Sequence, residues 1–114
     1  MLATCPSRIG REIRTDDAVV AALRTLAHGT GEVVMHAQRT WRSVTFSGSR
    51  HTLTIAFDGD AAVAGAEQLI EALPDHRWKI PGHLMADAAI ASMTQRADPP
   101  HLVMEVELLL LEDA

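Results

Sequence analysis

The chain has 114 residues, of which 47% are hydrophobic and 22% charged, and its formal net charge is −5 at pH 7. This composition predicts one soluble globular domain, and the single cysteine, Cys5, excludes an internal disulfide. Because no segment approaches the roughly 20 apolar residues that span a bilayer, we expect a cytoplasmic protein with no membrane partner.

The N-terminal residues show no regular pattern, so we expect residues 1–14 to form a loose arm and residues 15–114 to form the single domain. A helix is predicted next, because Thr15 and Asp16 supply a capping residue and an acid at its positive end. Gly29 comes after its last turn and is typical of a helix end. The apolar stripe of this helix has helical spacing and consists of Val19, Ala22, Leu23 and Leu26.

An extended segment from Glu32 to Ser47 and a second one from His51 to Phe57 predict a β-hairpin, with its turn in Ser47–Arg50. This turn would place Val44 opposite Leu53 and Phe46 opposite His51. The first strand is not uniform, since Val33, Met35 and Ala37 share the parity of Trp41 and not of Val44. Either both faces of this strand are covered, or a bulge between Ala37 and Ser43 exchanges them.

A second helix is predicted from Asp60 to Leu73, where Pro74 ends it. The segment from His83 to Arg96 is rich in alanine, which favours a helix. However, the compact turn Ala97–Pro100 leads directly into the C-terminal strand, and we therefore predict a strand that pairs with it. Closing the hairpin on that turn would give the pairs Met93–Met104, Ala91–Val106 and Ala89–Leu108.

The C-terminal segment from His101 to Glu112 alternates strictly and predicts a strand with one buried face. Its other face begins acidic at Glu105 and Glu107 and becomes apolar at Leu109 and Leu111. The elements together predict an α+β fold, a two-layer sandwich of a four-stranded antiparallel sheet with two helices on one face. The order αββαββ is a circular permutation of the ferredoxin-like order, an analogy that carries no function.

Helices cover only one face of such a sheet, and the other face would expose an apolar patch of the kind that marks an interaction surface. We expect this patch to form a homodimer interface of Trp41, Ile90, Leu109 and Leu111. Glu105 and Glu107 would meet Arg39 or Arg42 of the second copy. The sequence therefore predicts a small homodimeric interaction or binding protein, and it shows no identifiable catalytic motif.

The alternative is a small enzyme or small-molecule binder that uses the loop from Asp75 to His83, which joins the second helix to the second hairpin. Its candidate ligand-binding residues are His76, Trp78, His83 and Asp87. His76 or His83 would carry a proton and Asp87 would orient it. In the competing structural interpretation, Trp78 and Ile80 fill the core and the charged residues of the loop are solvated.

The remaining patterns predict no cofactor and no metal. The six histidines lack the ligand spacings of known zinc sites, and the sequence has no glycine-rich phosphate loop. Trp41 with neighbouring arginines, Arg39, Arg42 and Arg50, offers a surface for single-stranded nucleic acid. Because aromatic residues do not alternate with these arginines, we expect no nucleic-acid partner.

Overall fold

The computed structural model describes residues 17–80 and 82–112, so the arm predicted over residues 1–14 lies outside it. The N-terminal helix is described over residues 17–26. The later elements are β1 (Glu32–Arg42), β2 (Ser47–Asp58), α2 (Asp60–Ala72), the short 3-10 helix η1 (Leu73–Asp75), β3 (His83–Ala97) and β4 (Pro100–Glu112).

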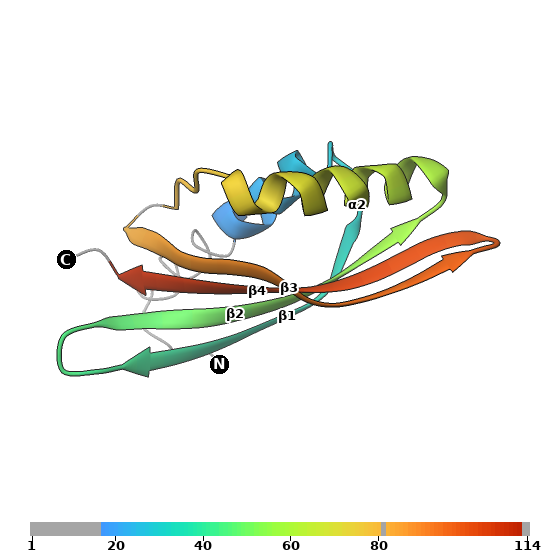
Figure 1. The fold of residues 1–114 in the computed structure, drawn as a ribbon. Coiled ribbons are helices and arrows are strands. Elements are labelled where there is room, and N and C mark those ends of the chain that lie inside the picture. Colours follow the sequence, from blue (N-terminus) through green and yellow to red (C-terminus); the bar gives the residue numbers. More distant parts are fainter. Residues whose placement is uncertain (1–16, 81, 113–114) are drawn as a thin grey trace, which may run out of the picture.

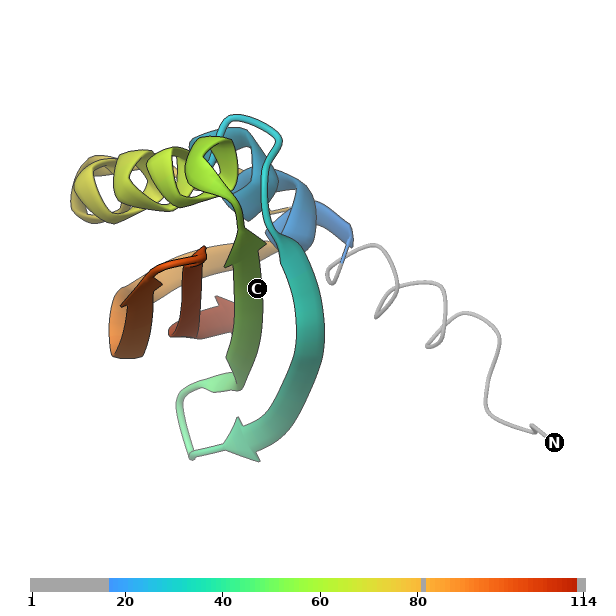
Figure 2. The same ribbon diagram turned by 90° about the vertical axis from the view of Figure 1, so that its right-hand side faces the viewer.

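The four strands form one antiparallel sheet in the order β1-β2-β4-β3. Both helices lie on the same side of this sheet, as Figure 1 and Figure 2 show. The predicted α+β fold with a four-stranded antiparallel sheet is therefore confirmed. The alanine-rich segment is strand β3, as predicted, because its pairing with β4 outweighs the helix propensity of its alanines.

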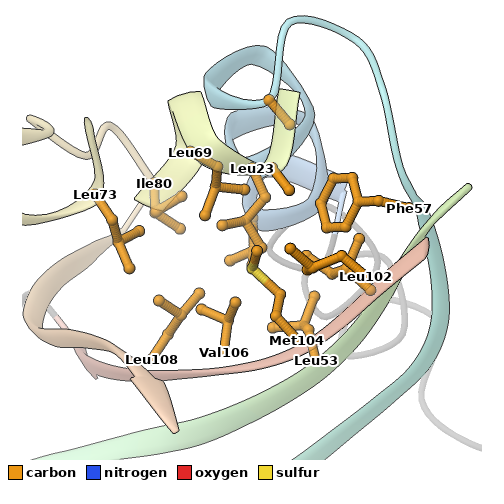
Figure 3. Packing of buried hydrophobic residues seen from close by; sticks show 14 of the residues in the cluster. Leu23, Leu53, Phe57, Leu69, Leu73, Ile80, Leu102, Met104, Val106 and Leu108 are labelled. Atoms are coloured by element: carbon orange, nitrogen blue, oxygen red, sulfur yellow. The ribbon is translucent and has the colours of Figure 1, made fainter. Parts of the chain in front are cut away.

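The core lies between the helices and the two central strands. Every second residue of β2 and β4 faces the helices and is buried, from Leu53 to Phe57 and from Leu102 to Leu110. Figure 3 shows these side chains meeting Leu23, Leu69 and Leu73 from the helical layer. This alternation is the direct product of the period-two pattern in the sequence.

The two helices approach each other closely at Gly65 of α2. A Cβ atom at this position would collide with the Thr30 side chain and with the Ala27 carbonyl oxygen. Thr30 comes after the N-terminal helix, and its hydroxyl donates a hydrogen bond of 2.6 Å to that same carbonyl. Glycine is therefore required at position 65 so that the helices can pack side by side over the sheet.

The turn of the first hairpin is Ser43–Phe46, so the turn predicted in Ser47–Arg50 is wrong. Ser43 closes the turn, since its N–H donates to the Phe46 oxygen (2.6 Å) and its hydroxyl accepts from the Phe46 N–H (3.0 Å). The resulting register pairs His51 with Gln38 and Leu53 with His36, and the expected pairs with Phe46 and Val44 are wrong.

The position of Gly48 explains why the predicted turn is wrong. It lies inside β2, where a Cβ atom would collide with the backbone oxygen of Leu110 in β4. A glycine within a strand often marks such a close approach of another backbone, and here it does not mark a turn.

The faces of β1 are set by a bulge between Val33 and Met35, earlier than the predicted position between Ala37 and Ser43. Most of β1 is exposed, so the other expectation, a strand covered on both faces, is also wrong. Beyond the bulge, His36, Gln38, Thr40 and Arg42 share the helix-facing side. Met35, Ala37, Arg39 and Trp41 share the open side.

Two bulges in β3, between Met85 and Asp87 and between Ile90 and Ser92, shift its pairing with β4. Met93 lies opposite Met104 as predicted, but Val106 pairs with Ile90 and not with Ala91. Leu108 likewise pairs with Ala88 and not with Ala89. Ile90 therefore packs against the core and does not lie on the open face where the alternation placed it.

Replacing Leu108 with alanine tests the assignment of the two faces. Leu108 is 1% exposed, and the Leu108→Ala change should lower the free energy of unfolding by about 2–5 kcal/mol, the usual cost of truncating a buried leucine. Val103→Ala, on the opposite face of the same strand, should cost less than about 1 kcal/mol. Urea denaturation of the three proteins measures both values, and equal losses would contradict the assignment.

Candidate functional site

The loop predicted to hold a ligand is fastened to the body of the protein. The rings of His76 and Trp78 meet edge to face, with centroids 4.8 Å apart and an interplanar angle of 85°. Trp78 packs against the core, Ile80 is buried, and the Ile80 carbonyl accepts a hydrogen bond of 3.0 Å from the His83 N–H. These contacts give the loop a structural role.

The structure does not gather the four candidate ligand-binding residues into one site. Asp87 is exposed and pairs with Leu109 on the open side of the sheet. His83 precedes Leu84, which pairs with Leu111 on that same side, and alternation therefore turns His83 toward the helix-facing side. Asp87 and His83 lie on opposite faces, so Asp87 is not placed to orient the His83 imidazole.

A different polar cluster lies on the helix-facing side of β1 and β2. The Ser49 hydroxyl is 2.9 Å from Nε2 of His51, and Nδ1 of His51 is 2.8 Å from Nε2 of His36. The two imidazole rings are tilted by 48° with their centroids 5.1 Å apart. Ser49 is 5% exposed and His51 is fully buried, whereas His36 at the end of the chain of hydrogen bonds is half-buried.

Two features of the chain build this cluster. Ser49 and His51 continue the buried row of β2, which otherwise holds Leu53, Ile55 and Phe57. The early bulge in β1 then turns His36 toward the same side, diagonally across from His51. The alternation of β2 alone indicates that His51 is a polar residue at a core position. Its partner His36 on β1 becomes evident only once the position of the bulge is known.

His51 is neutral at pH 7. Its burial, together with the nearby imidazoles of His36 and His83, lowers its pKa from 6.5 to about 4. A neutral imidazole carries one N–H, so His51 accepts a hydrogen bond at one nitrogen and donates at the other. The chain can therefore run from the Ser49 hydroxyl through His51 to His36, or in the reverse direction.

A hydroxyl joined to two imidazoles has the connectivity of a nucleophile, a base and an orienting group. Two observations argue against catalysis in this case. Ser49 is almost inaccessible, and a base whose pKa is about 4 accepts a proton poorly at neutral pH. The geometry supports a buried polar network that fixes the pairing of β1 with β2.

The open side of the sheet holds most of the residues predicted for an interface. One row across its four strands consists of Trp41, Gly48, Leu111 and Leu84. The next row consists of Arg39, Arg50, Leu109 and Asp87. Trp41, Leu109 and Leu111 are half-buried and Leu84 is 58% exposed. An apolar band therefore reaches from β1 to β3 on this side.

Beside the apolar band, the charges of the open side are divided between its two halves. Glu32 on β1, Asp58 on β2 and Arg96 on β3 lie at the other end of this side and do not follow the division. Arg39 and Arg50 lie on β1 and β2, and Glu105, Glu107 and Asp87 lie on β4 and β3. Two side-chain pairs of the described residues join the halves on this side: Arg50 lies 3.9 Å from Glu107, and Nδ1 of His101 lies 2.9 Å from Oδ1 of Asp58. Arg42, expected to face Glu105 or Glu107 of a second copy, lies on the helix-facing side by its register.

Comparison with protein-family models, with curated proteins and with solved structures found no match. Within residues 17–80 and 82–112, no helix is long and apolar enough to cross a membrane. The same part of the chain holds no group of three or more His, Cys, Asp or Glu residues that could bind a metal ion.

Acidification should destabilise the protein through His51. Its pKa of about 4 in the folded protein lies below the ordinary histidine value of 6.5, so the unfolded chain takes up the proton first as the pH falls from 6.5. The contribution of His51 is therefore complete above pH 6.5 and is lost toward pH 4, at a total cost of about 3 kcal/mol.

Urea denaturation at pH 7 and at pH 4.5 checks this expectation. In His51→Gln the loss of stability between the two pH values should be clearly smaller, because the titrating group is gone. Ser49→Ala removes one hydrogen bond and keeps the imidazole. The loss of stability of this variant between pH 7 and pH 4.5 should therefore resemble that of the unmodified protein. An unchanged pH dependence in His51→Gln would contradict the assignment.

Proposed function

We propose that this protein is a non-enzymatic interaction domain that forms a homodimer through the open side of its sheet. The observation that carries the proposal is the apolar band of Trp41, Leu84, Leu109 and Leu111 on a face that neither helix covers. Leaving such a band in water costs about 25 cal/mol per Å² of apolar surface. A two-fold pairing with a second copy is the commonest way to cover it.

The membership of the interface differs from the sequence prediction in one residue. Ile90 packs against the core on the other side of the sheet. Leu84, which is exposed beside Leu111, takes its place at the β3 end of the apolar band. Gly48 lies in the same row between Trp41 and Leu111, and it adds no side chain to the apolar band.

The division of charge favours one orientation of the two copies. A two-fold axis between the facing sheets and parallel to their strands would place β1 over β3 and β2 over β4. This rotation brings the arginine-bearing half of each copy over the acidic half of the other. An axis across the strands would bring like halves together, which like charges oppose.

The favoured axis also keeps each row over the same row of the second copy. Arg39 would lie over Asp87, and Trp41 would lie over Leu84. Gly48 would lie over Leu111. Charged pairs at the ends of the rows set the register, while the apolar band supplies most of the binding free energy.

The alternative function, a ligand site in the loop from Asp75 to His83, has less support because its candidate residues lie on both faces of the sheet. We retain the cytoplasm as the proposed location. Its support is the single cysteine, since small secreted domains commonly carry several cysteines in disulfides.

Replacing Leu109 and Leu111 with lysine should convert the dimer into a soluble monomer, because two charges would be buried without partners. Light scattering at tens of micromolar measures the mass. The matched control carries Ala64→Lys and Gln68→Lys on the exposed side of α2 and should remain a dimer. An unmodified protein that is monomeric at this concentration would refute the proposal.

Charge reversal tests the orientation of the copies. Arg39→Asp and Asp87→Arg should each weaken the dimer about tenfold in Kd, because each places like charges opposite each other. The double variant restores opposite charges and should recover most of the affinity. Sedimentation at several concentrations gives the three dissociation constants, and additive losses in the double variant would show that these residues do not face each other.

A further inference from the structure

The turn of the first hairpin presents two apolar side chains to water. Val44 is 104% exposed and Phe46 is 57% exposed. Three hydrogen bonds between Ser43 and Phe46 hold the turn in shape. Figure 1 shows this end of the hairpin projecting away from the helical layer. The core does not use these side chains, and they lie beyond the rows proposed for the dimer.

The half of this hairpin next to the turn is positively charged, whereas Glu32 and Asp58 lie at the opposite end of its strands. From Val33 to Phe57 the sequence has no aspartate or glutamate, and it has three arginines, Arg39, Arg42 and Arg50, all of them exposed. Alternation puts Arg42 on the helix-facing side and Arg39 with Arg50 on the open side. Both faces of the hairpin therefore carry arginine behind its apolar tip.

We propose that this hairpin tip, Ser43–Phe46, docks on an anionic phospholipid surface. Val44 and Phe46 would enter the boundary between headgroups and acyl chains, where apolar groups of peripheral proteins lie about 5–10 Å deep. Arg42 is two residues behind Val44, which is about 7 Å along a strand. This spacing places its guanidinium among the phosphates, which it binds through two hydrogen bonds at once.

Arg39 and Arg50 lie further back, at about 13–16 Å from the tip along the strands. At that height they would lie just outside the headgroups and within a Debye length of the surface charge. Glu112 lies at the same end of the sheet on β4, two strands or about 10 Å from Arg42. Asp87 lies in the same row as Arg39 and Arg50, and Glu107 pairs with Arg50. These three acids reduce the attraction without entering the tip.

An anionic membrane fits this arrangement better than a nucleic acid does. Nucleic acids that lie on a sheet need cations and aromatic rings on one face. Arg39, Arg50 and Trp41 share the open side with Asp87, Glu105 and Glu107, whose carboxylates repel phosphates. Exposed valine and phenylalanine at the very end of the hairpin gain from lipid contact. The sequence-based expectation of no membrane partner concerned spanning segments, and this docking needs none.

In the proposed dimer, the axis parallel to the strands would place both hairpin tips at the same end of the particle. This part rests on the proposed function, whereas docking by one hairpin does not. Two tips that reach one flat surface together bind more strongly than either tip alone.

Sedimentation of the full chain with vesicles tests the proposal. The unmodified protein should bind vesicles of phosphatidylcholine and phosphatidylserine at a ratio of about 3:1 more strongly than vesicles of phosphatidylcholine alone. Val44→Ser with Phe46→Ser should weaken binding at least about tenfold, and Arg42→Gln about fivefold. The matched control, Val34→Ser with Met35→Ser, removes exposed apolar groups at the other end of β1 and should bind normally.

Light scattering of the same variants separates this proposal from the dimer. A tip variant that stays dimeric and loses vesicle binding supports docking by the hairpin. Failure of the unmodified dimer to bind the anionic vesicles overturns the lipid proposal and leaves the dimer standing. Equal losses in the tip variant and the control would also overturn it. So would tighter binding to a single DNA strand of about 30 nucleotides than to vesicles at the same salt concentration.

Discussion

The pairing of β2 with β4 is the constraint on which the rest of the structure depends. Its register runs from Gly48 opposite Leu111 to Asp58 opposite His101 without a shift. Because both strands keep strict alternation, their helix-facing residues form one continuous buried surface. The apolar stripes of both helices pack on this surface, and the outer strands attach to either side of it. A register shift by one residue would turn all of these side chains to water.

The outer strands adapt to this rigid centre through bulges. One bulge in β1 and two in β3 insert extra residues and exchange the faces of the residues beyond them. The bulge in β1 brings His36 to His51 and leaves Trp41 on the open side. The bulges in β3 carry Ile90 into the core. Small local irregularities therefore decide which residues are available for binding, although they change neither the fold nor the strand order.

Polar groups occur in two different settings in this protein. Ser49 and His51 are buried and hydrogen-bonded to each other and to the half-buried His36, so the main effect of this cluster is on stability. Beside the apolar band, the arginines of β1 and β2 and the acids of β3 and β4 are accessible and lie on different strands. Accessible charge of one sign beside apolar groups favours recognition of a surface, and this is why both proposals concern contacts and not chemistry.

The sequence by itself determined the class of the fold, because periods of two and of 3.6 residues need no tertiary information to be recognised. It also determined the buried rows of β2 and β4 and the apolar end of β4 at Leu109 and Leu111. Only the tertiary structure decided the turn at Ser43–Phe46, since Gly48 signals a turn in the sequence and a close backbone approach in the sheet. It alone also decided the meeting of His36 with His51 and the separation of His83 from Asp87. The positions of His36 and Asp87 depend on bulges. Packing between strands sets where these bulges lie, and such packing leaves no periodic pattern in the sequence.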